Sequence, residues 1–136
     1  MQCNTNYENT MLGVSHVNLR VLQTYRRLFW WASLGLSDHT TSLAVVLGAV
    51  TLGARVIERH FTDNQAAHGP DHAFSMGPEG WRRMVGSVRE LEAALGNPGK
   101  VVCPNETEAR IVQRRAMWNG RPLRPCPPDR EGELNG

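Results

Sequence analysis

The sequence lacks several features by which classes of protein are recognised. It has three cysteines in 136 residues, Cys3, Cys103 and Cys126, without the spacing of a metal site, which argues against a disulfide scaffold and favours a reducing compartment. Fifteen basic residues against 13 acidic ones leave no footprint of a nucleic-acid binder. The longest nearly apolar run, Leu43 to Ala54, is too short to span a bilayer, which needs about 20 residues. We therefore predict a cytoplasmic chain with neither nucleic acid nor membrane as a partner.

What the sequence contains is an alternation of strand-like and helical patterns. Apolar residues recur at spacings of three and four from Val14 to Phe29, and this predicts a helix. The other predicted elements are strands at the N-terminus, in residues 32–36 (with Trp30 and Trp31 at its start) and in residues 55–61, and helices over residues 43–52, stopped by Gly53, and over residues 78–95. The order strand, helix, strand, helix, strand predicts an α/β fold with parallel strands joined by crossovers.

The composition divides the chain into three parts. Residues 1–96 carry the alternating pattern, whereas residues 97–115 read as a linker. Residues 116–136 are rich in proline and have no periodic apolar pattern, so a disordered tail is predicted there.

Two histidines follow neighbouring predicted strands and form the main candidate site. Because the carboxyl ends of parallel strands meet at one edge, His39 and His60 should lie close together. Side chains alternate along a strand, so Ser37 shares a face with His39, and Glu58 shares one with His60. Two imidazoles beside a carboxylate and a hydroxyl can bind a divalent ion and leave positions open for substrate.

Each of these residues also has a structural interpretation. A single histidine at a strand end is more often a hydrogen-bonded structural residue than a ligand, and spacing alone does not decide between the two. Asp71, in the turn Gly69–His72, is placed to accept hydrogen bonds from sugar-like hydroxyls, but aspartate is also a common turn-forming residue.

Several motifs in a fixed order resemble the sialic acid synthase family, the phosphoenolpyruvate-dependent N-acetylneuraminate synthases. The resemblance covers roughly residues 1–115. It rests on Gly-Leu-Ser-Asp-His-Thr at 35–40, Leu-Gly-Ala-Val-Thr-Leu-Gly-Ala at 47–54, Arg-Val-Ile-Glu-Arg-His-Phe-Thr at 55–62, Gly-Pro-Asp-His-Ala-Phe-Ser-Met at 69–76, and Arg-Glu-Leu-Glu-Ala-Ala-Leu-Gly at 89–96.

The resemblance implies a partial (β/α)8 TIM barrel, in which residues 1–96 supply the last three strands with their helices. Residues 97–115 would lead towards an antifreeze-like domain that caps the barrel of a partner subunit in the family's homodimers. A full barrel of this kind needs about 250 residues. The isolated chain is therefore expected to be inactive unless the missing half of the barrel is supplied.

The resemblance also implies a reaction and a role for each candidate residue. Phosphoenolpyruvate would condense with N-acetylmannosamine or a related hexose, giving a nine-carbon 2-keto acid and phosphate. His39 and His60 match the ligands of a divalent metal, usually manganese, with magnesium or zinc as alternatives. Among the substrate contacts, Ser37 matches a residue that contacts phosphate, and Asp71 and Tyr7 match residues near the sugar. Glu58 matches an acid facing the same pocket, and with the two histidines it completes the predicted catalytic set.

Three alternatives to this interpretation stay open. The sugar acceptor could be that of a legionaminate or pseudaminate synthase, because these enzymes share the motifs. The chain could be a non-catalytic metal-binding module that keeps the strand-end histidines, or the product of a degraded gene without a function.

Overall fold

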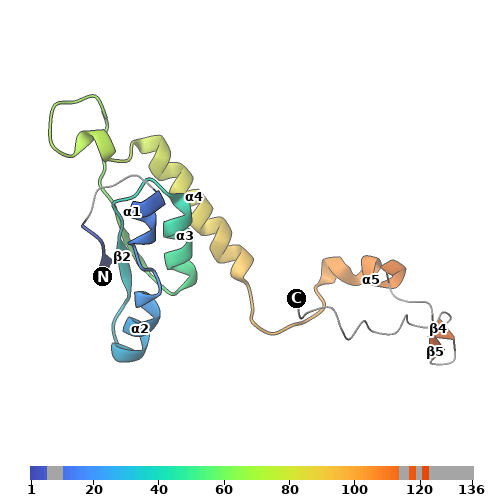
Figure 1. The fold of residues 1–136 in the computed structure, drawn as a ribbon. Coiled ribbons are helices and arrows are strands. Elements are labelled where there is room, and N and C mark those ends of the chain that lie inside the picture. Colours follow the sequence, from blue (N-terminus) through green and yellow to red (C-terminus); the bar gives the residue numbers. More distant parts are fainter. Residues whose placement is uncertain (6–10, 114–116, 119–120, 123–136) are drawn as a thin grey trace, which may run out of the picture. The chain divides into compact units, whose positions relative to one another are not determined.

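The computed structural model describes residues 1–5, 11–113, 117–118 and 121–122. The chain forms two compact units, Met1–Gly96 and Asn97–Gly136, whose elements are shown in Figure 1. Tyr7 and most of the predicted tail lie outside the described residues.

A three-stranded parallel sheet organises the first unit. Its strands are β1 (Gln2–Cys3), β2 (Gly35–Ser37) and β3 (Val56–Glu58), arranged in the order β1-β2-β3. Cys3 pairs with Ser37, and Ser37 pairs with Glu58, so these three residues form one row across the sheet. The predicted α/β fold with parallel strands is confirmed, although each strand is shorter than its apolar pattern.

The helix predicted from Val14 to Phe29 is two helices, so this prediction was wrong. α1 (Met11–Ser15) and α2 (Val21–Leu28) are separated by a turn in which Asn18 has a φ of 51°. Asparagine tolerates this left-handed conformation because its short side-chain amide can form hydrogen bonds with the nearby backbone. Here the Asn18 side chain donates to the carbonyl of His16 at 3.0 Å. Because the apolar spacing continues from one helix to the next, the sequence pattern does not reveal the break between them.

The core lies between the sheet and its covering helices. α3 (Leu43–Thr51) is apolar on nearly every face because it packs on the strands and on α4. Its end is a Schellman motif: Gly53 has a φ of 98°, and the amides of Gly53 and Ala54 bond to Val50 and Ala49. The buried core residues are Val17, Leu22, Leu36, Val45, Ala49 and Ala54.

A long connection and a long helix complete the first unit. The chain after β3 forms an isolated bridge between Phe61 and Met76, so it returns alongside the extension of its own strand. A short 3-10 turn, η1 (His72–Phe74), lies within this connection. α4 (Pro78–Leu95) begins at the predicted proline and ends before Gly96, whose φ is 48°. Figure 1 shows this connection at one end of the unit and the α2–β2 connection at the other.

The second unit contains regular structure where the sequence predicted a linker and a tail. η2 (Pro104–Glu106) and α5 (Thr107–Gln113) fall within the predicted linker. Within residues 116–136, β4 (Met117–Trp118) and β5 (Arg121–Pro122) form a short antiparallel pair. The other residues of that segment lie outside the described ones. In the described part of the chain, no helix combines the length and apolar character needed to cross a membrane.

Candidate functional site

The two strand-end histidines lie side by side. His39 follows β2 and His60 follows β3, each two residues beyond the paired row of Ser37 and Glu58. Their ring centroids are 5.1 Å apart, with an angle of 52° between the ring planes. Both residues are half-buried. The structure therefore brings together the four residues that strand alternation placed on one face.

A short hydrogen-bond chain connects three of these four side chains. The Ser37 hydroxyl donates to Glu58 Oε1 at 2.7 Å, and the same hydroxyl oxygen lies 3.4 Å from His39 Nε2. Ser37 is 8% exposed, whereas Glu58 reaches solvent. Because the hydroxyl proton is directed at the carboxylate, the hydroxyl oxygen can accept from His39 when Nε2 carries the proton.

The connection after β3 brings Asp71 to the same place. Asp71 Oδ2 lies 3.8 Å from His60 Nδ1, and the Phe74 ring packs edge-on against His60 with centroids 5.2 Å apart. The segment is fixed by the 2.7 Å contact between Thr62 Oγ1 and His72 Nδ1, and by the Ser75 hydroxyl, which donates to the Asp71 carbonyl at 2.6 Å. These contacts place the Asp71 carboxylate beside the His60 ring, at a distance longer than a hydrogen bond.

Sequence reasoning missed one member of the cluster. Cys3 Sγ lies 3.6 Å from His39 Nε2. Cys3 occupies the same row as Ser37 and Glu58, so it faces the same side of the sheet. Knowing that Cys3 pairs with Ser37 would have predicted this contact. The first strand is too short, however, for its sequence pattern to fix the register with the second. Tyr7, the residue that was predicted from this segment, lies outside the described residues.

A buried ion pair occupies the opposite face of the same strand ends. Arg59 Nε lies 3.5 Å from Asp38 Oδ2, and the two side chains are 4% and 0% exposed. Asp38 Oδ1 also accepts from the amide of Thr40 at 2.9 Å. Burial lowers the pKa of Arg59, and the charge of Asp38 opposes this shift. Because Asp38 and Arg59 immediately precede the two histidines, this pair holds the strand ends that carry the rings.

The donor set fits a divalent metal held by two imidazoles. Imidazole nitrogen binds such ions at about 2.0–2.1 Å, so two rings on one ion would have centroids about 4.5–5.2 Å apart. The observed 5.1 Å lies within this interval. Across the described residues, no group of three or more His, Cys, Asp and Glu side chains is arranged to hold a metal. A pair of protein ligands leaves the remaining positions to substrate and water, as in an open catalytic site.

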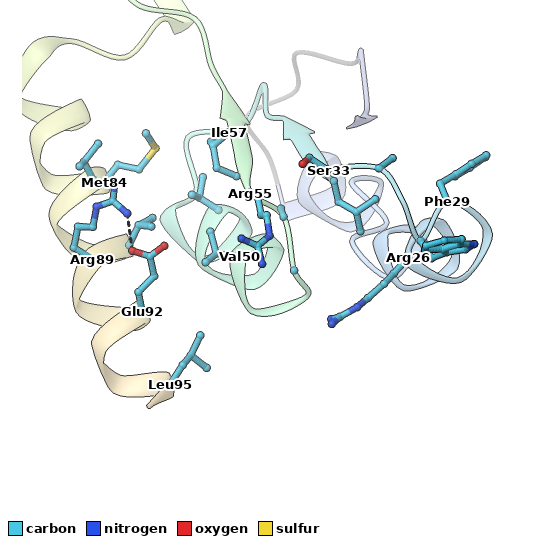
Figure 2. Close-up of a pocket in the computed structure, with 18 of the residues that line it drawn as sticks. Arg26, Phe29, Ser33, Val50, Arg55, Ile57, Met84, Arg89, Glu92 and Leu95 are labelled. Carbon is cyan, nitrogen blue, oxygen red and sulfur yellow. Dashed lines mark hydrogen bonds and ion pairs between the residues drawn. The ribbon is translucent and has the colours of Figure 1, made fainter. Parts of the chain in front are cut away.

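A larger hollow lies away from these residues. A cavity of about 760 Å³ is lined by the α2–β2 connection, the amino ends of the strands, α3 and α4. Figure 2 shows Arg26 and Phe29 on one side of it, Met84 and Leu95 of α4 on the other, and Arg55 between them. The histidines do not line it. We assign the candidate site by its chemistry, because volume alone does not bring reactive groups together.

The fold and the site together define the class of protein. It is an α/β protein with side chains suited to bind a ligand at the carboxyl ends of its parallel strands. A model of the NeuB family matches residues 1–100. This chain belongs to the NeuB family.

Named relatives and a solved structure agree with this assignment. The chain is 42% identical over 106 residues to the N-acetylneuraminate-9-phosphate synthase of Homo sapiens, which covers 78% of this chain and 29% of that protein. It is 38% identical over 123 residues to the N,N'-diacetyllegionaminic acid synthase of Legionella pneumophila, with coverage of 90% and 33%. The crystal structure of an N-acetylneuraminic acid synthetase from Leptospira borgpetersenii superposes with a TM-score of 0.64 at 26% identity, covering 84% of this chain and 40% of that one. The chain thus spans about a third of the length of these curated relatives.

Proposed function

We propose that this chain provides the metal-binding side of the active site of a sugar-acid synthase. In this proposal residues 1–96 are the last three strands of a (β/α)8 barrel with their helices. Three observations support it: membership of the NeuB family, the parallel order β1-β2-β3, and the 5.1 Å separation of the two imidazoles. The last of these carries the proposal, because it concerns the chemistry and not only ancestry.

The proposed reaction joins phosphoenolpyruvate to an N-acetylated hexose. C3 of phosphoenolpyruvate forms a bond to the aldehyde carbon of the open-chain sugar, water adds at C2, and phosphate leaves to give a nine-carbon 2-keto acid. N-acetylmannosamine or a related hexose is the proposed acceptor, with the acceptors of legionaminate and pseudaminate synthases as the alternative.

His39 and His60 are the proposed ligands of a divalent ion, with manganese as the first choice and magnesium or zinc as alternatives. When bound, the ion would supply Lewis-acid polarisation of the sugar aldehyde. Asp71 Oδ2, 3.8 Å from His60 Nδ1, would favour the tautomer with its proton on Nδ1 and so leave the other nitrogen of that ring for the ion.

The remaining residues of the cluster would meet the substrates. Ser37 is the proposed phosphate contact, and its hydroxyl, which donates to Glu58 in this structure, would turn to donate to a phosphate oxygen when substrate binds. Glu58 reaches solvent on the same side and is a candidate for contact with substrate hydroxyls. Asp71, 56% exposed at its side chain, has room for a sugar hydroxyl as well as for His60. Tyr7 stays a prediction from the sequence.

We further propose that the 136-residue chain alone does not catalyse the reaction. Three strands provide one side of a barrel, and the groups on the opposite side must come from additional polypeptide. A homodimer, implied by the family resemblance, and a cytoplasmic location, predicted from the composition, are part of the same proposal.

Manganese binding tests the metal site directly. Free Mn²⁺ is measured by electron paramagnetic resonance during titration of the wild-type chain, His39→Ala, and His68→Ala as a matched control on an exposed histidine in the same unit. We expect His39→Ala to weaken binding by about tenfold or more, since one of two protein ligands is lost. Equal affinity for wild type and His39→Ala would refute the metal assignment.

Catalysis is tested by supplying the absent part of the barrel. The chain is assayed with both substrates, alone and together with a separately produced polypeptide carrying the first five strands of a relative. Keto acid formed only by the mixture supports the proposal. Keto acid formed by the chain alone would contradict the proposed inactivity. Metal binding without activity in any mixture would instead favour a non-catalytic metal-binding module.

A further inference from the structure

The connection between α2 and β2 exposes four consecutive large apolar residues. Leu28, Phe29, Trp30 and Trp31, here called the aromatic tip, are 59%, 43%, 80% and 68% exposed. Folded monomers rarely leave such side chains contiguous on the surface without a binding role. The sequence analysis placed Trp30 and Trp31 only at the start of a strand, and the strand in fact begins at Gly35.

The rings of the aromatic tip support one another. Tyr25 packs edge-on against Phe29 with centroids 5.9 Å apart, and Phe29 packs against Trp31 at 6.0 Å. Trp30 and Trp31 meet edge-on at 5.8 Å. These contacts hold the rings in a preformed cluster while leaving most of the indole surface in water, so a partner would bind them at little ordering cost.

The segment that contains the aromatic tip carries charge of one sign, whereas α4, on the other side of the same cavity, contributes Arg89 and Glu92, which pair with each other. Residues 11–37 contain Arg20, Arg26 and Arg27 and neither aspartate nor glutamate. Arg55 lines the same cavity as Arg26 and the two tryptophans, and Figure 2 shows it between the α2 side and the α4 side. Within the described part of the chain, none of these four arginines forms an ion pair with an acidic side chain.

Other exposed apolar residues of the unit lack this combination. Val85 and Leu95 on α4 are 45% and 51% exposed. The same helix carries Glu79, Glu90 and Glu92 as well as Arg82, Arg83 and Arg89, so charges of both signs surround its apolar residues. The aromatic tip, by contrast, follows a stretch of sequence that carries arginines and no acidic residue.

We propose that the aromatic tip attaches the chain to an anionic lipid surface. Tryptophan is favoured at the boundary between headgroups and acyl chains, and arginine beside it pairs with anionic headgroups. No segment of the sequence is long and apolar enough to span a bilayer, and this predicted no membrane partner, but attachment at the surface requires no span. The tip lies at the amino ends of the strands and the histidines at the carboxyl ends, so attachment leaves the candidate site facing away from the lipid.

The test is co-sedimentation of the full 136-residue chain with vesicles of phosphatidylcholine, with and without one third phosphatidylglycerol. The variants are Trp30→Ser/Trp31→Ser and Arg26→Gln/Arg27→Gln. Val101→Ser/Val102→Ser is the matched control, since these side chains are 65% and 48% exposed and do not line the cavity of the aromatic tip. Circular dichroism of each variant checks that it folds, and Mn²⁺ binding reports independently on the histidines.

We expect binding to anionic vesicles that weakens with salt and is about tenfold weaker or absent on neutral ones. The tryptophan variant should lose it, and the arginine variant should bind about fivefold more weakly per arginine. The control should bind like wild type. No binding by wild type, or equal binding by wild type and the tryptophan variant, would overturn the proposal. So would a wild-type dimer, in the absence of lipid, that the tryptophan variant dissociates, because a second copy would then cover the tip.

Discussion

Replacing Arg59 by methionine tests how strongly the buried ion pair holds the strand ends. Methionine keeps an unbranched apolar stem but lacks the guanidinium, whose Nη1 lies 4.0 Å from Met84 Sδ, and it leaves Asp38 without a counter-charge. The side chain of Asp38 is fully buried and keeps only the hydrogen bond from the Thr40 amide. Breaking a buried pair by removing one partner costs about 3–5 kcal/mol. We expect the lower part of that range, because the 3.5 Å approach makes no direct hydrogen bond.

The assay is urea denaturation followed by circular dichroism at 25 °C, for wild type, Arg59→Met and Asp38→Asn/Arg59→Met. Arg55→Met serves as the control, since Arg55 is exposed. The double variant should recover most of the lost free energy of unfolding, because it removes both charges. A loss below about 0.5 kcal/mol in Arg59→Met, or no recovery in the double variant, would refute this account of the pair.

The contribution of Arg59 to the free energy of unfolding depends on pH with a definite sign. Burial lowers the pKa of Arg59 below its value in the unfolded chain, with Asp38 opposing the shift. The folded state therefore loses that proton first as the pH rises, and the unfavourable effect of burying the charge is relieved only in strongly alkaline solution. Between about pH 6 and 9 Arg59 keeps its proton in both the folded and the unfolded state. The part of the difference in free energy of unfolding between wild type and Arg59→Met that comes from Arg59 should therefore be constant there.

Three further substitutions, with Leu28→Ala as a control, test the fold that carries the site. Leu36→Ala empties a fully buried position and should lower the free energy of unfolding by about 2–5 kcal/mol in urea denaturation. Leu28 is 59% exposed, so Leu28→Ala should change the same free energy by less than about 0.5 kcal/mol. Gly53→Ala forces alanine to a φ of 98° and should lower stability by about 1–2 kcal/mol in the same assay, and no change would contradict the helix-ending role. Thr62→Val removes the hydroxyl that contacts His72 and the backbone of Asn64, so amide hydrogen exchange should accelerate in residues 62–76 and not in α3.

The sequence predicted the approach of His39 and His60 because that inference needs only two general facts. Parallel strands end at the same edge, and alternate residues share a face. Neither fact depends on side-chain packing, so the four-residue face could be found before the structure. Asp71 was also predicted near the rim, but its place beside His60 depends on the Thr62–His72 contact within the connection, which no local pattern reveals.

Other features could not be predicted because they depend on pairings between distant residues. Asp38 and Arg59 are 21 positions apart, and each reads as an ordinary charged residue until the register of β2 and β3 places them on the helix-covered face. Asn18 breaks a helix whose apolar spacing continues through the turn. The same spacing runs on to Phe29, although Leu28 and Phe29 are exposed, because periodicity shows which side of a helix is apolar and not where the packing against it ends.

The two ends of this sheet carry unrelated properties, and the distance between them has a practical consequence. Side chains in the α2–β2 connection belong neither to the histidine cluster nor to the ion pair beneath it. Mutagenesis there can tune solubility, labelling or immobilisation while the chemistry at the far rim is left as it was. For the same reason, related proteins could differ in sequence in the α2–β2 connection without any change in the residues at the carboxyl ends of the strands.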